Sequence, residues 1–145
     1  MNNYEMKAIS KINYTCSEID ALYHQASLKL GISDSISIVL YTVYDLGDHC
    51  LLSEVYKKTG ISRQTVNSAI RSLEADSILY LEQHTGRSKK IALTDKGKKF
   101  VEETIGKLRM AEIQTFEAWS EEEIDTYIRL LEKYAYCFQK QVEKM

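Results

Sequence analysis

Apolar residues recur every three or four positions near both ends of this 145-residue chain, and this repeat constrains the fold more than any other feature. The N-terminal stripe consists of Ile9, Ile12, Cys16, Ile19, Tyr23, Ala26 and Leu30, and the C-terminal stripe of Ile124, Tyr127, Leu131, Tyr134, Phe138 and Val142. The spacing predicts a long amphipathic helix at each end, with a narrow apolar face that packs on another long helix. Because 145 residues can hardly cover two such faces, we expect a homodimer.

The composition favours a mostly helical chain. The sequence contains no proline, and proline normally marks loops and sheet edges. The cysteines Cys16, Cys50 and Cys137 are odd in number and lack metal-ligand spacing, so we expect free thiols. No apolar run approaches the roughly 20 residues of a membrane span. The N-terminus lacks a basic region followed by an apolar core, so we expect no signal peptide and a cytoplasmic location.

The middle of the chain predicts short helices followed by a β-hairpin. The expected elements are helices over residues 6–30, from a cap at Ser33 or Asp34 to Gly47, and over 53–58 and 63–75, strands over 78–82 and 89–93, a helix from the Thr94 cap to Leu108, and a last helix after Ser120. Ser120 and Glu123 have the spacing of a capping box. The turn residues between the strands are Thr85-Gly86-Arg87-Ser88. Short helices, a turn and a hairpin in this order are typical of a winged helix-turn-helix.

Charge is distributed unevenly although the formal net charge is only −2. Residues 1–56 carry three Lys or Arg against seven Asp or Glu, and residues 100–145 carry six against ten. Residues 57–99 carry ten basic against four acidic residues, a net of +6. A basic middle between acidic ends indicates that the middle contacts a polyanion, although a solvated basic face has the same pattern.

The helix over residues 63–75 combines an apolar face with a polar one. Val66, Ile70 and Leu73 are expected to pack on the preceding helix. The expected DNA-contacting residues are Ser62, Arg63, Gln64, Thr65, Asn67, Ser68 and Arg71 on this helix, with Arg87, Lys89 and Lys90 on the hairpin. Arg, Gln and Asn can pair in bidentate fashion with guanine and adenine edges in the major groove. Hydroxyls and free N–H groups at the start of the helix suit a phosphate.

The chain resembles the multiple-antibiotic-resistance regulator (MarR) family of bacterial transcription factors. The resemblance covers the long first helix, the Gly60-Ile61-Ser62 turn, the hairpin with Arg87, and Leu93-Thr94-Asp95-Lys96-Gly97 before the last helices. It implies a mostly α fold in which residues 1–32 and 100–145 form dimerisation helices and residues 33–99 form the winged helix-turn-helix. It also implies a homodimer on pseudo-palindromic double-stranded DNA, and a small-molecule pocket between the dimer helices and the winged domain.

Two positions depart from the family pattern. Thr85 stands where the family commonly has an acidic residue, two positions before the arginine at the tip of the hairpin. We therefore expect the hairpin to be held less by its own ion pair and more by DNA. Tyr56 stands where a small residue is usual, so its ring should alter how the two helices pack, and its hydroxyl could reach a phosphate.

Tyrosines on the first two predicted helices suggest a site for a small-molecule effector. Four tyrosines lie on the first two predicted helices: Tyr14, Tyr23, Tyr41 and Tyr44. An apolar wall with phenol hydroxyls suits a small aromatic or phenolic effector, and packing of a dimer core is the alternative explanation. The expected regulator is a repressor released by such an effector.

Four other interpretations concern a redox-responsive regulator, an interaction subunit, a metal site and an enzyme. A redox-responsive regulator would use Cys16, but this residue occupies the apolar stripe, where we expect a buried, inert thiol. A winged-helix interaction subunit without operator binding would explain the fold but not the basic middle. His24, His49 and His84 are too far apart in sequence for a metal site, and no cofactor is expected. No nucleophile elbow or phosphate loop indicates an enzyme.

Overall fold

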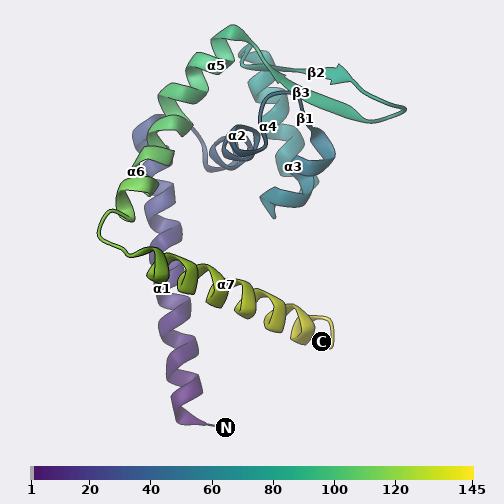
Figure 1. Ribbon diagram of the computed structural model, residues 1–145. Helices are drawn as coiled ribbons and strands as arrows, with labels where there is room; N and C mark the ends of the chain where they lie inside the picture. The colour runs from purple at the N-terminus through teal and green to yellow at the C-terminus, as the bar shows by residue number, and fades with distance from the viewer. Residues whose placement is uncertain (1) are drawn as a thin grey trace. The chain divides into compact units, whose positions relative to one another are not determined.

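The computed structural model describes residues 2–145; Met1, the first residue of the expected N-terminal segment, lies outside them. The chain forms two compact units, Met1–Leu108 and Arg109–Met145. Its elements in chain order are α1 (Asn3–Leu30), α2 (Asp34–Leu46), β1 (Cys50–Leu51), α3 (Leu52–Thr59), α4 (Arg63–Ala75), β2 (Leu79–Gln83), β3 (Lys89–Leu93), α5 (Asp95–Val101), the π-helical turn η1 (Glu102–Gly106), α6 (Lys107–Thr115) and α7 (Glu121–Val142) (Figure 1). The expected mostly α winged helix with a small hairpin is confirmed.

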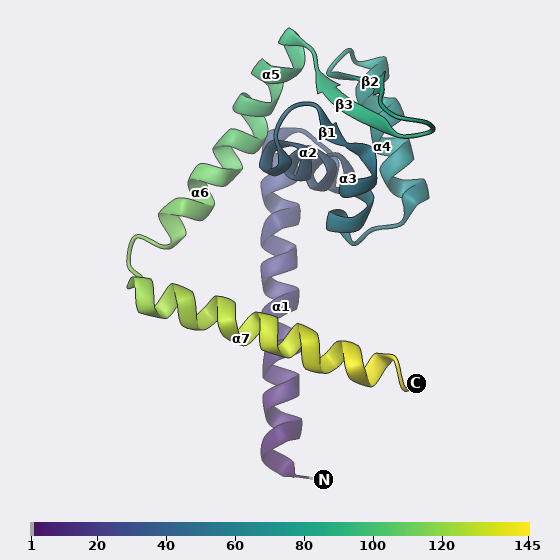
Figure 2. The ribbon, with the colours of Figure 1, turned by 45° about the vertical axis from the view of Figure 1, so that its right-hand side comes forward.

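The first helix is long and solvent-exposed over most of its length. The Asn2 side chain caps its start by accepting from the Tyr4 N–H, and Gly31 ends it at a φ of +70°. Within the first unit α1 extends away from the other elements (Figures 1 and 2). Its apolar stripe is therefore uncovered, and Ile9 is 52% exposed. Cys16, expected to be buried, is exposed in the single chain for the same reason.

The core of the first unit lies where α2, α3, α4 and the sheet meet. Its fully buried side chains include Val39, Leu40, Val43, Val55, Val66, Leu73, Leu79, Ile91 and Ile105. The α2 and α4 contributions follow helical spacing, as the pattern of apolar residues predicts. Ser33 caps α2 by accepting from the Ile36 N–H, and α2 ends before Gly47.

The sheet has three antiparallel strands in the order β1-β3-β2. Leu81 pairs with Ile91 across the hairpin, and Ile91 also pairs with Cys50 of β1 on its other side. The bounds of the two hairpin strands were predicted to within one residue. Strand β1 was not predicted, because a strand of two residues is too short to show an alternation of apolar and polar side chains. The free end of the hairpin projects beyond α3 and α4, and we call residues 79–93 the wing (Figure 2).

Gly97 allows the start of α5 to approach the chain just before β2 very closely. Thr94 caps α5 by accepting from the Gly97 N–H at 2.9 Å, and its hydroxyl lies 3.2 Å from the Ile78 carbonyl oxygen. A Cβ atom on Gly97 would lie 1.8 Å from that same carbonyl oxygen. The Thr94–Gly97 motif thus has a packing explanation: only glycine fits where the helix meets the Ile78 backbone.

The expected helix after Thr94 is present but interrupted. Residues 102–106 form a π-helical turn, which inserts one extra residue and rotates the face of the helix that follows. Ile105 within this turn and Leu108 just after it are both buried, and the Thr104 hydroxyl donates to the Phe100 carbonyl.

The second unit is dominated by α7. Ser120 and Glu123 form the predicted capping box, with reciprocal bonds of 3.1 and 2.8 Å. No α7 side chain is buried in the single chain. Trp119 packs edge-on against Phe116, with a centroid distance of 5.1 Å. It also packs against Tyr127 in a tilted arrangement, with a centroid distance of 5.7 Å.

Among residues 2–145 no single helix is both long and apolar enough to cross a membrane. Helices α1 and α2 pass this test only when joined, and they are bent by 91° at the break between them.

Candidate nucleic-acid interface

Helix α4 presents its polar face because its apolar face is locked in the core. Val66, Ala69, Ile70 and Leu73 are at most 3% exposed, as the spacing predicted. The exposed residues around them are Arg63, Gln64, Thr65, Ser68 and Arg71. Basic and amide side chains are therefore gathered on the face turned away from the core, where they can reach another molecule.

The start of α4 uses its hydroxyls internally. Ser62 is the N-cap, and its Oγ accepts from the Thr65 N–H at 3.1 Å. The same Oγ lies 2.8 Å from the Thr65 hydroxyl oxygen. Both residues are exposed, but each hydroxyl already has a partner within the turn. Any phosphate at this helix start would share or replace that pair.

Asn67 differs from its exposed neighbours. It is half-buried, and its Oδ1 accepts a hydrogen bond from the Tyr56 hydroxyl of α3. The Arg63 guanidinium lies over the Tyr56 ring, 4.5 Å from its centroid. Tyr56 therefore bridges the two helices of the motif and contacts two residues expected on the DNA-facing side. The sequence marked Tyr56 as bulky for its position, but no local pattern indicates these partners.

The wing carries exposed basic side chains on a well-formed turn. Arg87 and Lys89 are exposed, and Lys90 is half-buried between Leu51 and Glu82 in the sheet register. The Gln83 side-chain amide donates to the Gly86 carbonyl at 2.5 Å, and the His84 and Ser88 N–H groups close the turn. No acidic partner of Arg87 occurs among the ion pairs of residues 2–145.

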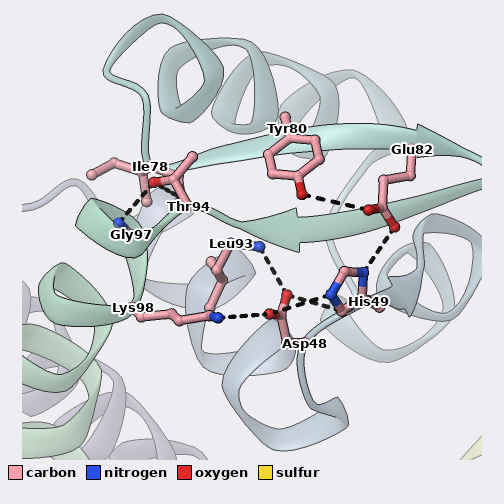
Figure 3. Close-up of polar contacts among 9 residues, drawn as sticks. All are labelled: Asp48, His49, Ile78, Tyr80, Glu82, Leu93, Thr94, Gly97 and Lys98. Carbon is pink, nitrogen blue, oxygen red and sulfur yellow. Dashed lines mark hydrogen bonds and ion pairs between the residues drawn. The ribbon is translucent and has the colours of Figure 1, made fainter.

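A polar cluster holds the base of the wing, and sequence reasoning missed it (Figure 3). Asp48 Oδ1 accepts from the Leu93 N–H at 2.8 Å, and Asp48 Oδ2 lies 3.8 Å from Lys98 Nζ. His49 Nδ1 lies 2.8 Å from Glu82 Oε2, and His49 Nε2 lies 3.6 Å from Asp48 Oδ2. His49 has a φ of +61°, which turns the chain sharply after α2. The cluster joins the loop after α2 to both wing strands and to α5.

The three thiols differ in their surroundings. Cys16 and Cys137 are exposed, whereas Cys50 is half-buried in β1. Burial raises the pKa of the Cys50 thiol above its usual range; a backbone hydrogen bond opposes this and the nearby Asp48 charge adds to it. Burial disfavours the thiolate, so Cys50 is a poor nucleophile.

The tyrosines of the expected effector site occupy two environments. Tyr14 and Tyr23 lie on the exposed surface of α1, at 73% and 45% exposure. Tyr41 and Tyr44 are half-buried and pack against the core from α2. Tyr14 does not pack against the core residues of the described chain. Helix α1, which carries it, extends away from the core of the first unit (Figure 1).

Two histidines, His24 and His49, lie within ion-pair distance of carboxylates. His24 Nδ1 lies 2.8 Å from Asp34 Oδ2, which links the end of α1 to the start of α2. Across residues 2–145 no three His, Cys, Asp or Glu side chains are grouped so that they could hold a metal ion.

The fold has many solved counterparts, and those described below share 18–23% of their sequence with this chain. No family model and no curated protein matches the sequence. NMB1585, a MarR family regulator from Neisseria meningitidis, is 18% identical, with a TM-score of 0.79 and 99% of each chain covered. A MarR/EmrR family regulator from Acinetobacter sp. ADP1 is 22% identical, with a TM-score of 0.72, and the match covers 99% of this chain and 100% of that one.

A third counterpart is BpsR of Bordetella bronchiseptica, whose DNA binding is regulated by 6-hydroxynicotinic acid. It is 23% identical, with a TM-score of 0.58, and the match covers 83% of this chain and 98% of BpsR. The chain therefore has the winged helix-turn-helix fold of the MarR family regulators. The resemblance inferred from the Gly60–Ser62 turn, the hairpin and the Thr94–Gly97 motif is confirmed at the level of the fold.

Proposed function

We propose that this chain is a cytoplasmic DNA-binding transcriptional regulator that binds pseudo-palindromic double-stranded DNA as a homodimer. The observation that carries the proposal is the pairing of an exposed polar face on α4 with an exposed basic wing in one compact unit. A helix of this kind fits the major groove, and a basic hairpin fits the adjacent phosphates or minor groove. The fold shared with regulators such as NMB1585 supports the same function.

Each part of the interface has a different role in the proposal. Gln64, Asn67 and Arg71 would read base edges, while Arg63, Ser68 and the hydroxyls of Ser62 and Thr65 would add contacts at the helix start and along the backbone. The wing would grip the backbone through Arg87, Lys89 and Lys90. Residues 33–99 would then form the DNA-binding domain.

The test is a binding-site selection on wild type, Arg71→Ala and Arg87→Ala at two salt concentrations. Arg71→Ala should relax preference at particular base pairs by about 1–3 kcal/mol, at symmetry-related positions about one helical turn apart. Arg87→Ala should weaken binding to all sequences. It should also lower the slope of the logarithm of the binding constant against the logarithm of the salt concentration by roughly 0.9 per lost phosphate contact, and a symmetric dimer loses two such contacts. Lys11→Ala, the same kind of charge loss on α1, is the control and should change neither. A wild-type protein that selects no sequence would favour the interaction-subunit reading.

Dimerisation is proposed through residues 1–32 and 100–145. The support is the exposure of apolar side chains on α7, where Leu131 and Phe138 are 49% and 54% exposed. Light scattering at micromolar concentration should give twice the 16.7 kDa chain mass. Leu131→Glu should dissociate or aggregate the protein, and Glu132→Ala beside it, off the apolar stripe, should not. A dimer that persists in Leu131→Glu would contradict this interface.

We further propose that the protein is a repressor and that a small aromatic or phenolic effector releases it from DNA. The regulation of BpsR by 6-hydroxynicotinic acid supports this effector class. An inducer must bind the DNA-free form better than the DNA-bound form, and a tenfold release needs about 1.4 kcal/mol of such coupling. Titration of the selected complex with 6-hydroxynicotinic acid measures it, and Tyr41→Ala should weaken the response if the tyrosines line the site.

A redox-responsive regulator is the alternative, favoured by the exposure of the Cys16 thiol in the single chain. Peroxide should then release the selected DNA from wild type and from Cys137→Ser, but not from Cys16→Ser. Release that is equal in all three proteins would exclude Cys16 as the sensor.

A further inference from the structure

Tyr56 contacts two residues that the proposed function places on the DNA side of α4. Its hydroxyl donates to Asn67 Oδ1, and its ring lies under the Arg63 guanidinium. Tyr56 itself is half-buried between α3 and α4, so its ring is positioned by packing. A side chain held by the core therefore determines how two surface side chains are oriented.

The hydrogen bond changes what Asn67 can recognise. A carboxamide pairs with adenine in bidentate fashion by accepting from N6 through Oδ1 and donating to N7 through Nδ2. In this structure Oδ1 is turned toward the Tyr56 hydroxyl. This bond takes one of the two lone pairs of Oδ1 and fixes the direction of the carbonyl, so Nδ2, with its two N–H donors, is the group whose hydrogen bonds all remain for a DNA base. Guanine N7 and O6, or thymine O4, are the matching acceptors in the major groove.

The ring contact acts on Arg63 in a different way. A guanidinium over an aromatic face gains roughly 0.5–1 kcal/mol at an exposed site, and it loses rotamer freedom before any ligand binds. Arg63 is the first residue of α4, so this stacking holds a positive charge at the end of the helix that would enter the groove.

We propose that Tyr56 is a positioning residue for sequence specificity, an inference that rests on the proposed DNA binding. It holds Asn67 Oδ1 toward the Tyr56 hydroxyl and leaves the Nδ2 donors for DNA, and so favours guanine or thymine over adenine at the base that Asn67 meets. Through its ring it also holds Arg63 ready for general DNA contact.

The experiment is the same binding-site selection, performed on wild type, Asn67→Ala, Tyr56→Phe and the double variant. Asn67→Ala identifies the base pair that this residue reads, as the position where preference relaxes. In wild type that position should select guanine or thymine on the contacted strand. Tyr56→Phe keeps the ring and the Arg63 contact but removes the hydroxyl, so adenine should become acceptable there, with about a tenfold loss of discrimination. In the double variant the hydroxyl should no longer matter.

Two further variants separate the ring from the hydroxyl. Tyr56→Leu should additionally weaken binding to all sequences, because Arg63 loses its platform. Tyr136→Phe is the matched control, since Lys140 lies 4.9 Å from its ring centroid on α7, and it should alter neither preference nor affinity.

The outcomes distinguish this inference from the proposed function. Selection of adenine by wild type at the Asn67 position, or identical preferences in wild type and Tyr56→Phe, overturns the role of Tyr56 while leaving DNA binding intact. Absence of any selected sequence for wild type overturns both. The first criterion uses wild type and Asn67→Ala only, and so holds even where Tyr56→Phe is poorly folded.

Discussion

Asp48 Oδ1 accepts a hydrogen bond from the backbone N–H of Leu93 at 2.8 Å, across 45 positions of sequence. This bond joins the loop after α2 to the last residue of β3, which then leads into the Thr94 cap of α5. The same carboxylate lies near Lys98 and His49 (Figure 3). The Asp48 side chain thus ties the base of the wing to the loop after α2, in addition to the strand pairing and the core.

Replacement of Asp48 should therefore cost more than that of an ordinary surface acid. Asp48→Ala leaves the Leu93 N–H without its acceptor, and we expect a loss of about 1–3 kcal/mol in the free energy of unfolding. Asp48→Asn keeps an oxygen acceptor and removes the charge, so it should lose about 1 kcal/mol or less. Urea unfolding of the three proteins measures both values. Equal losses in the two variants would assign the effect to charge and not to the Leu93 bond.

Gly97 should be intolerant of any side chain. Its Cβ would lie 1.8 Å from the Ile78 carbonyl oxygen, so Gly97→Ala must displace either α5 or the chain before β2. We expect a loss of about 3 kcal/mol or more, beyond ordinary overpacking. Gly106→Ala is the control: its Cβ would lie 3.0 Å from the end of the Glu102 side chain, and the nearest backbone atom, the Val101 carbonyl oxygen, is at an ordinary 3.8 Å. Because alanine favours helix over glycine by about 1 kcal/mol, this variant should be neutral or more stable. Thermal unfolding of both compares them directly.

Thr59 offers a stabilising substitution. Its Oγ1 is buried and has no hydrogen-bond partner within residues 2–145. Thr59→Val replaces this hydroxyl by a methyl group of similar shape, and we expect a gain of about 1 kcal/mol. Thr104→Val is the matched control, because the Thr104 hydroxyl donates to the Phe100 carbonyl at 2.7 Å, and its loss should not stabilise. The denaturant midpoints of the two variants test this pair, provided that the slope of unfolding free energy against denaturant concentration is unchanged. A destabilised Thr59→Val would indicate that the Thr59 hydroxyl stabilises the native turn.

The raised pKa of the Cys50 thiol predicts a pH dependence with a definite sign. Because the folded state favours the neutral thiol, its contribution to stability is present below the ordinary thiol pKa of about 8.5 and is lost as pH rises through the higher folded value. The difference in unfolding free energy between wild type and Cys50→Ala should therefore shrink above about pH 8.5. At a fixed pH, iodoacetamide should also label Cys50 more slowly in the native protein than in urea. A constant difference across this pH range would contradict the assignment.

Local chemistry was sufficient to predict most helices and the hairpin. The hydroxyl caps at Thr94 and Ser120 bind N–H groups three residues ahead, so a short stretch of sequence is enough to identify them. Apolar spacing likewise predicted which face of α4 is buried, since helical geometry alone brings Val66, Ile70 and Leu73 to one side. These features depend on neighbours in the chain.

Features that depend on distant partners were settled only by the folded chain. Strand β1 exists because Cys50 and Leu51 meet β3, and no local pattern of residues marks the π-helical turn at Glu102–Gly106. The bonds from Tyr56 to Asn67 and from Asp48 to Leu93 join separate elements whose approach no periodicity encodes. Residue type and spacing establish what a side chain is able to do, whereas packing of the core determines which partner it meets.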